Sequence, residues 1–236
     1  MSRECFTQCL VLGRNQSSHQ NLILPFNNFV IIVPPLDADQ PLEWYEDSSL
    51  SAQEALKLLV ERIRKNGPVK QRHLQQLYQR CQSAEELEKA LRLTRLNYLA
   101  RGQLSQHDPF SHRTSAVLLH EAMRLGAPEL AERALLRSGE FGLPGANARH
   151  FNQLLIYHSK QSNLRAMLET YELMKRAGPR PDSETCFILV KGCVDAGRTD
   201  LAELVVNEFE IAQVRVRNGT RLYIEQHRGM QQQQGL

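Results

Sequence analysis

Residues 148–182, which read ARHFNQLLIYHSKQSNLRAMLETYELMKRAGPRPD, contain two helix-forming stretches separated by a short turn. Apolar side chains recur at spacings of three and four within residues 151–158 and again within residues 166–174, as on one face of a helix. The Ser-Asn pair at 162–163 has turn chemistry. Gly178, followed by two prolines, ends the second stretch. These 35 residues therefore predict a helical hairpin.

The same order begins again at Ser183 and runs to Arg217. Its internal turn, Ala196-Gly197-Arg198, falls near the fourteenth to sixteenth residue of the unit, as the first turn does. One helical hairpin cannot bury its apolar face alone, so repeated hairpins stack on one another and share a core and a surface. The repetition predicts an all-α chain built as a solenoid of stacked helical hairpins.

Two weaker units with the same phase precede this pair, at residues 71–106 and 112–147. Both contain helical apolar patterns, although ordinary helical pairs at these places would show the same patterns. Residues 51–66 predict a separate amphipathic helix before them, because Ser51 and Glu54 have the spacing of a capping box. We therefore expect a leading helix followed by four hairpins.

The chain is expected to have three regions. Residues 51–217 form the helical-repeat array, and residues 1–50 form an irregular or targeting extension. Residues 218–236 form a short helix or a disordered tail, whose end is rich in glutamine. The apolar run Leu22–Val33 in the extension is strand-like but too short to span a bilayer, so no membrane span is expected.

Several residues of the two best units occupy the positions of a known repeat. They are Phe151-Asn152 at the start of the first helix, Ala166 and Ala202 in the second helices, and Met174-Lys175, Gly178 and Pro181-Asp182 at the first unit's end. With these residues the units resemble pentatricopeptide repeats, the helical hairpins of organellar RNA-binding proteins. Tetratricopeptide repeats fit less well. The second unit departs from the pattern in having Gln213 and Val216 where the first has its terminal glycine and proline. The resemblance implies a right-handed α-solenoid.

The resemblance also implies a base-reading pair, because in that family the fifth and the last residue of a repeat choose the base. In residues 148–182 these are Asn152 and Asp182, a pairing associated with pyrimidines and especially uracil. An amide can donate to and accept from a base, and a carboxylate can orient the amide. Arg149 occupies the flanking base-stacking position. In the alternative interpretation, Asn152 bonds locally and Asp182 stabilises the start of the next helix.

The other units do not continue this code. The equivalent positions hold Phe187 and Arg217 in the next unit, and the unit at 112 has Ala116 at its fifth position. One correct base contact contributes discrimination of about 1–3 kcal/mol, which is too little to select one transcript. The resemblance therefore implies an adaptor that docks within a larger ribonucleoprotein, with organellar mRNA or rRNA and ribonucleoprotein or ribosomal proteins as partners.

Charge is unevenly distributed along the chain, whose net charge is +3. Residues 51–111 carry eleven basic and six acidic side chains, and residues 1–50 carry two basic and six acidic ones. A basic array suits contact with phosphate, which gives salt-sensitive attraction without regard to sequence. The alternative function is a protein–protein scaffold that uses the same groove without RNA. An aligned row of Arg and Lys favours RNA, whereas apolar or acidic groove positions favour the scaffold.

Motifs for catalysis or metal binding are absent from the sequence. The five cysteines are scattered without CxxC spacing, so neither a zinc site nor a disulfide framework is expected. His120-Glu121 lacks the second histidine of a zinc-protease helix, and both residues are expected on a helix surface. Of His150 and His158, one is expected to be exposed and the other partly packed. We therefore expect that the protein is not an enzyme and that it binds no cofactor, metal or small-molecule substrate.

The start of the chain gives an expectation about location. Residues 1–36 contain one acidic residue, Glu4, with Arg3 and Arg14 and several Ser and Gln. This composition is compatible with an organellar transit peptide, and equally with an unstructured leader. Together with the family resemblance it implies a mitochondrial protein, with the plastid as the alternative. The implied role is in organellar gene expression, and a component of the mitochondrial ribosome is one form that this role could take.

Overall fold

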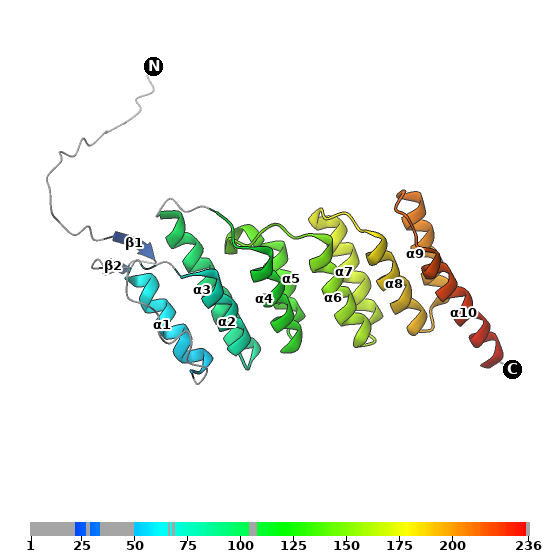
Figure 1. The fold of residues 1–236 in the computed structure, drawn as a ribbon, viewed down its shortest axis with the longest axis horizontal. Helices are drawn as coiled ribbons and strands as arrows, with labels where there is room; N and C mark the ends of the chain where they lie inside the picture. The colour runs from blue at the N-terminus through cyan, green and yellow to red at the C-terminus, as the bar shows by residue number, and fades with distance from the viewer. Residues whose placement is uncertain are drawn as a thin grey trace, which may run out of the picture.

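The computed structural model shows a row of helices preceded by a two-stranded hairpin (Figure 1). The described residues are 22–26, 29–33, 50–65, 67, 69–103 and 108–234. Within them the helices are α1 (Ala52–Arg64), α2 (Gln71–Arg80), α3 (Ala84–Gln103), α4 (His112–Arg124), α5 (Pro128–Leu136), the short 3-10 helix η2 (Ser138–Phe141), α6 (Ala148–Lys160), α7 (Leu164–Ala177), α8 (Ser183–Asp195), α9 (Thr199–Ile211) and α10 (Asn218–Gln234).

The apolar run near the start of the chain forms two short strands. β1 (Leu22–Phe26) pairs antiparallel with β2 (Phe29–Val33). Pro25 lies opposite Val30, and in a two-stranded hairpin both strands are edges, where proline is tolerated. The rest of the expected targeting segment lies outside the described residues.

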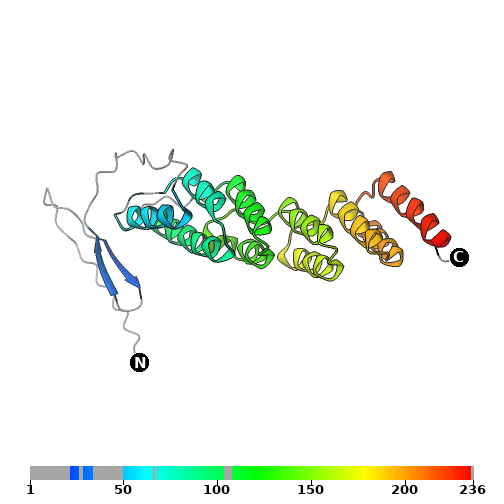
Figure 2. The ribbon, with the colours of Figure 1, turned by 90° about the horizontal axis from the view of Figure 1, so that it is seen from below.

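The helices form two layers, which Figure 2 shows from the side. The A layer consists of α2, α4, α6, α8 and α10, and each of these packs on the next. The B layer consists of α1, α3, α5, α7 and α9, in which close packing between neighbours is limited to α1–α3 and α3–α5. Successive helices run in opposite directions, as stacked hairpins require. The predicted α-solenoid of helical hairpins is thereby confirmed.

The period of the array continues beyond the two best units. α6, α8 and α10 begin at Ala148, Ser183 and Asn218, which are 35 residues apart in each case. α10 packs on α8 much as α8 packs on α6, and it buries Thr220 and Ile224. Of the two states expected for residues after 217, the helix is therefore the one found. α10 occupies the place of a further A helix.

Three of the four turns from A helices to B helices share one backbone geometry, whereas the α2–α3 turn at residues 81–83 has no left-handed residue. Gly126, Ser162 and Gly197 have φ of 68°, 54° and 73°. Each is the fifteenth residue counted from the start of α4, α6 or α8. A left-handed residue here lets the chain leave one helix and enter the next within three residues. The weaker unit at 112 therefore makes the same turn as the two best units.

The ends of the B helices show how one departure from the repeat pattern is accommodated. Gly178 follows α7 with φ of 99°, and Gln213 follows α9 with φ of 57°. Both are the thirty-first residue of their units. For a residue with a Cβ atom, the left-handed conformation costs about 1–2 kcal/mol. The second unit thus keeps the backbone of the first and accepts local strain at Gln213.

The core lies between the two layers and runs through α6. Phe151 and Leu154 of α6 pack into the cluster formed by the N-terminal helices, and Leu155 packs into the cluster formed by the C-terminal helices. All three side chains are fully buried. α6 therefore joins the two halves of the array.

Candidate nucleic-acid interface

The structure brings the expected base-reading pair together. Asn152 lies on α6 and Asp182 immediately precedes α8, and the Asn152 Nδ2 donates to Asp182 Oδ1 at 3.4 Å. The Oδ1 of Asn152 accepts from the Thr185 hydroxyl at 2.8 Å. Only 3% of Asn152 is exposed. Both ends of the amide are thus occupied by protein groups.

Asp182 has a defined local role as the N-cap of α8. Its Oδ1 accepts from the backbone N–H of Glu184 at 3.1 Å and of Thr185 at 2.8 Å, and the Thr185 hydroxyl accepts from the backbone N–H of Asp182. Burial alone would raise the pKa of Asp182, but the hydrogen bonds from Thr185, Asn152 and Glu184 lower it below its usual range. The carboxylate is therefore held ionised by the start of α8.

This geometry bears on how a base could use the pair. A base edge could reach the amide of Asn152 only if it displaced Asp182 or the Thr185 hydroxyl. The local interpretation of both residues accounts for every contact that they make in the structure. Base reading by Asn152 and Asp182 stays a prediction, which substitution can test.

Arg149 is part of a row that sequence reasoning did not assemble. It is the second residue of α6, is exposed, and has no hydrogen-bond or ion-pair partner for its side chain among the described residues. Arg113 is the second residue of α4 and is equally exposed and unpaired, and Arg72 is the second residue of α2. Glu184 occupies this position in α8. Counting from each helix start would have found the row.

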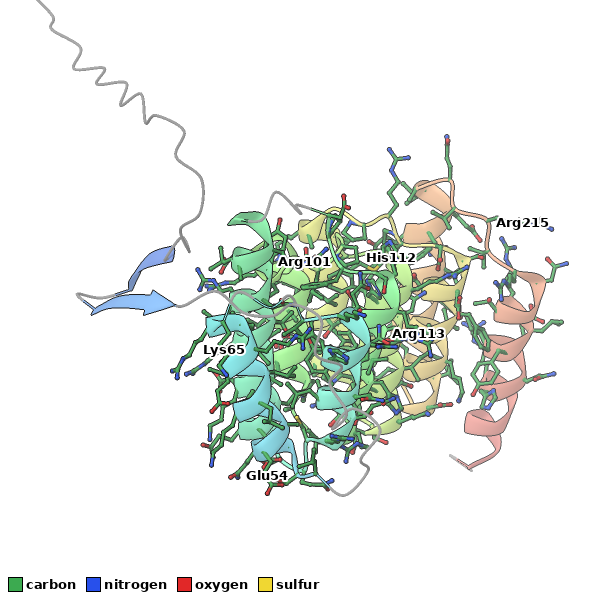
Figure 3. The ribbon with its side chains drawn as sticks, turned by 60° about the vertical axis from the view of Figure 1, so that its left-hand side comes forward. Glu54, Lys65, Arg101, His112, Arg113 and Arg215 are labelled. Carbon is green, nitrogen blue, oxygen red and sulfur yellow. The ribbon has the colours of Figure 1, made fainter. Side chains whose placement is uncertain are left out.

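The row belongs to a larger surface, which we call the basic edge. It comprises the described residues of the connections that lead from a B helix to the next A helix, with the first two residues of that A helix: 65–72, 108–113, 137–149, 178–184 and 212–219. They include nine basic and four acidic residues. Seven of the basic side chains have no polar partner within the described part of the chain: Lys65, Lys70, Arg113, Arg149, Arg180, Arg215 and Arg217. Figure 3 shows Lys65, Arg113 and Arg215 well above Glu54, which lies at the other edge.

The opposite edge, built by the same definition from the A-to-B turns, has a different charge. It comprises the turns with the first two residues of each following B helix, at 81–85, 125–129, 161–165 and 196–200, together with the start of α1 at 50–53, and includes two basic and three acidic residues. Both basic side chains are paired, Arg165 with Glu169 at 2.8 Å and Arg198 with Asp200 at 2.6 Å. Unpaired positive charge is therefore concentrated on one edge of the solenoid.

A groove on the A layer opens between α6 and α8 and holds about 450 Å³. Phe187 and Arg217, which hold the base-reading positions of the second unit, both line it, together with Lys160 from α6. Lys160 and Arg217 are exposed and have no polar side-chain partner among the described residues. The ring of Phe187 is half-buried and lies edge-on to Tyr223, with centroids 6.1 Å apart. The groove thus combines an aromatic ring with free cations, beside the carboxylate of Glu184 and the ion pair of Lys191 with Asp195.

Two expectations about polar residues on the A helices are wrong. Glu121 is only 5% exposed and not on the surface, although His120 is. Its carboxylate accepts from Arg124, which also donates to the Cys81 carbonyl at 2.6 Å. The cause is that α4 is covered on more than one side, by α2, α5 and α6.

The second correction concerns the two histidines of α6. Both are buried, His150 at 4% and His158 at 6% exposure. Burial lowers the pKa of each, reinforced at His150 by the charge of His112 and opposed at His158 by Glu132 and Glu169. No group of three or more metal-ligating side chains occurs within the described residues.

The fold and this surface define the chain as a helical-repeat protein of the α-solenoid class. No protein-family model matches the sequence, and a search of curated proteins gave no match. Among solved structures, the chain is similar to the pentatricopeptide-repeat domain of Arabidopsis thaliana protein-only RNase P 1, which was solved in complex with tRNA. The similarity has a TM-score of 0.46 and 18% sequence identity, and covers 75% of this chain and 90% of that one. No helix in the described part of this chain is long and apolar enough to cross a membrane.

Proposed function

We propose that this chain binds single-stranded RNA along the A layer and the basic edge, as a non-catalytic adaptor within a ribonucleoprotein. The observation that carries the proposal is the alignment of unpaired cations at one edge of the array, with Arg113 and Arg149 at equivalent places on successive A helices. Cations without intramolecular partners are free to contact phosphates and release counterions. The aligned row of cations favours RNA binding over the alternative function, a protein–protein scaffold that uses the same surface without RNA.

The groove between α6 and α8 supports a single strand as the form of RNA. An exposed ring face can stack on any base, and neighbouring cations can hold the backbone on either side. Phe187 supplies the ring, and Lys160 and Arg217 supply the cations. Such a site tolerates many sequences, because every base has a stacking face. Affinity then comes mainly from charge and stacking, and selection of a target from the surrounding assembly.

The cellular setting is a further part of the proposal. The acid-poor segment 1–36 and the repeat pattern of residues 148–182 support an organellar location, in the mitochondrion or alternatively the plastid. One legible base-reading pair is too few to choose a transcript, which supports work inside a larger particle such as the organellar ribosome. Fractionation of tagged full-length protein and co-sedimentation with ribosomal particles would test this. Recovery only in light cytosolic fractions would contradict it.

RNA binding itself can be measured by fluorescence anisotropy with a labelled uridine oligomer over a range of salt. Replacing both Arg113 and Arg149 with alanine is expected to weaken binding and to lower the salt slope by roughly 0.7 for each phosphate that is no longer neutralised. The matched control replaces Lys57 and Arg165, two exposed cations of the B layer, and should change neither quantity. Absence of binding by the unmodified chain, or an equal effect in the control, would refute the proposal.

The base-reading prediction has its own test. If Asn152 reads uracil, Asn152→Ala weakens binding of a uridine oligomer more than that of an adenosine oligomer. If Asn152 only supports the start of α8, both affinities fall equally. Thr185→Val provides the comparison, because it removes the hydroxyl bonded to Asn152 and Asp182 and leaves the amide in place.

A further inference from the structure

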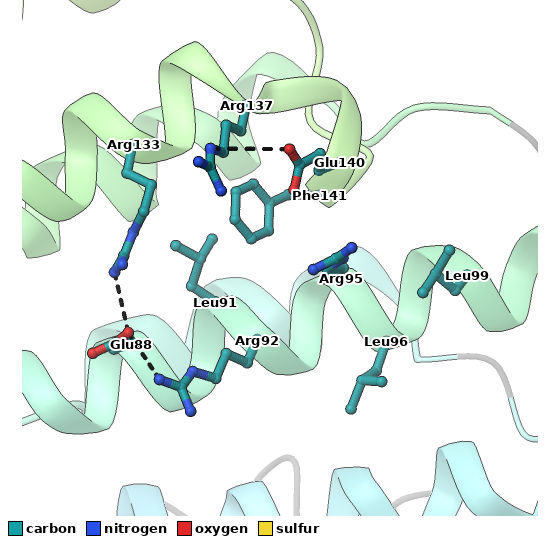
Figure 4. Close-up of a pocket in the computed structure, with 10 residues that line it drawn as sticks. All are labelled: Glu88, Leu91, Arg92, Arg95, Leu96, Leu99, Arg133, Arg137, Glu140 and Phe141. Carbon is teal, nitrogen blue, oxygen red and sulfur yellow. Dashed lines mark hydrogen bonds and ion pairs between the residues drawn. The ribbon is translucent and has the colours of Figure 1, made fainter. Parts of the chain in front are cut away.

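A second groove lies on the other face of the array, between α3 and the pair formed by α5 and η2 (Figure 4). It holds about 520 Å³, within the range of cavities that accept small ligands or a few partner side chains. Leu91 and Phe141 lie at its base and are only 2% and 7% exposed. Leu99 at its margin is 47% exposed. The groove therefore offers an apolar floor and an accessible apolar margin.

The shape of the groove is fixed by close packing between α3 and the residue that follows η2. Gly142, which follows η2 with φ of 66°, lies so close to the ring of Tyr98 on α3 that a Cβ atom there would be 2.1 Å from it. The carbonyl of Gly142 accepts from the backbone N–H of Phe110 at 2.6 Å. These contacts hold η2, and with it Phe141, against α3. A ligand would thus meet a site that is already formed.

Four arginines surround this apolar floor, against two carboxylates. Arg92 and Arg133 share the single carboxylate of Glu88, at 3.0 and 3.3 Å. Arg137 makes a long ion pair with Glu140, at 3.9 Å. Arg95, one helical turn from Arg92, is exposed and has no polar partner within the described residues. The groove therefore has two more positive than negative charges, next to exposed leucine.

We propose that this groove docks an acidic, amphipathic segment of a partner protein, with carboxylates about one helical turn apart beside a leucine or an aromatic residue. The carboxylates pair with Arg95 and with the guanidinium groups that share Glu88, and bidentate arginine–carboxylate pairs of this kind are strong and directional. The apolar side chain lies over Leu91 and Phe141. Arginine is also one of the residues that are enriched at protein–protein hot spots.

A nucleic acid fits this groove less well than such a segment. Three of the four arginines already pair with Glu88 or Glu140, which leaves Arg95 as the one cation of this groove without a polar partner within the described residues. A leucine margin gives no stacking face, and Phe141 is buried and cannot offer one. The groove lies on the B layer, whereas the cations Arg113 and Arg149 lie on the A layer. Docking of a protein segment here covers Arg137 of the basic edge but leaves Arg113 and Arg149 open, so the two sites can be occupied together.

The test is selection of a random phage-displayed peptide library on the full-length protein, followed by anisotropy with the enriched peptides. We expect enriched peptides to combine Asp or Glu at helical spacing with Leu or Trp. Arg95→Gln and Arg95→Glu remove or reverse an exposed charge that makes no polar interaction within the described residues, so both should fold. We expect the reversal to weaken peptide binding about tenfold, as the removal of one charge pair would, and the neutral change to have a smaller effect.

Two controls decide between this groove and other surfaces. Lys57→Glu reverses another exposed cation, on α1, that has no polar partner within the described residues, and it should leave peptide binding unchanged. A uridine oligomer should not compete with the peptides. The proposal is overturned if the enriched peptides have no acidic bias, or if Arg95→Glu binds them as well as the original chain. It is also overturned if the Arg113 and Arg149 variants abolish peptide binding instead, or if Arg95→Glu abolishes binding of the uridine oligomer. The outcomes read from peptide enrichment and peptide affinity do not depend on whether the chain binds RNA.

Discussion

The two edges of this solenoid are made by the same alternation of helices, yet they differ in both charge and backbone. The opposite edge consists mainly of short turns, three of which have a left-handed residue at one fixed position, Gly126, Ser162 or Gly197, and both of its described cations are paired. The basic edge consists of connections of varied length, in which seven cations are unpaired. This difference indicates that the stacking of hairpins constrains the A-to-B turns, whereas the B-to-A connections are free to carry ligand contacts.

The largest expected effect is on stability, and it concerns Gly142, a residue of the basic edge that is constrained by close packing. Gly142→Ala places a Cβ atom 2.1 Å from the Tyr98 ring at a residue with φ of 66°. Overpacking and left-handed strain together are expected to lower the free energy of unfolding by about 3 kcal/mol, measured by urea denaturation. Gly145→Ala, three residues along the same connection, meets no atom within 4 Å and should have little effect. Equal stability of the two variants would contradict the packing described.

The second effect concerns a buried histidine next to the basic edge. His73 on α2 is buried, and burial, followed by the charges of Arg72, Arg62 and Lys70, lowers its pKa to about 4. Because the unfolded chain binds this proton near pH 6.5, stability is full above pH 6.5 and is lost as the pH falls towards 4. The loss is on the order of 2–3 kcal/mol.

The measurement is thermal or urea unfolding between pH 7.5 and pH 4, compared with the same series for His73→Leu. The variant should have a shallower dependence of stability on pH across this window, whatever its stability at pH 7.5. Identical slopes would show that His73 is not the group responsible.

The third effect would extend the row of cations. Glu184 interrupts it on α8, so Glu184→Arg is expected to strengthen binding of a uridine oligomer about fivefold at low salt and to raise the salt slope by roughly 0.7. Glu129→Arg makes the same charge reversal on the opposite edge and should change the slope far less. Equal gains from both would mean that net charge matters and the edge does not.

The smallest effect concerns the strained residue of the basic edge. Gln213→Gly relieves left-handed strain at φ of 57°, partly offset by the greater freedom of glycine in the unfolded chain. We expect a gain of about 0.5–1 kcal/mol in the free energy of unfolding. Ala212→Gly, one residue earlier with φ of −73°, should lose stability. A loss at both positions would show that Gln213 is not strained.

Much of the fold follows from local signals in the sequence. The helix starts at Ser51 and Asp182 are capping residues, and both make the expected hydrogen bonds. The end at Gly178 has the expected left-handed backbone. Each of these depends on residues within a few positions of one another, which is why a single sequence contains them. The left-handed conformation of Gln213 could not be predicted, because glutamine as a residue type does not indicate that conformation.

The sites depend on distances that local patterns do not contain. The row of Arg113 and Arg149 needed the common phase of the units. The groove with Arg95 and Arg133 needed the packing of α3 against α5. The burial of Glu121 and His150 came from helices on several sides of one A helix. The location of the chain and base reading by Asn152 and Asp182 stay predictions.

The position of α6 in both core clusters has a mechanical meaning. Each hairpin in a repeat array is held by its neighbours alone, so tension or thermal opening spreads only where adjacent units share packed side chains. Phe151 and Leu154 are anchored on one side, and Leu155 on the other. Loosening the α6–α7 hairpin would divide one cooperative unit into two segments that unfold independently. Because α7 also contributes Met174 to the first cluster and Met167 to the second, opening that begins at either end of the array must pass through this hairpin.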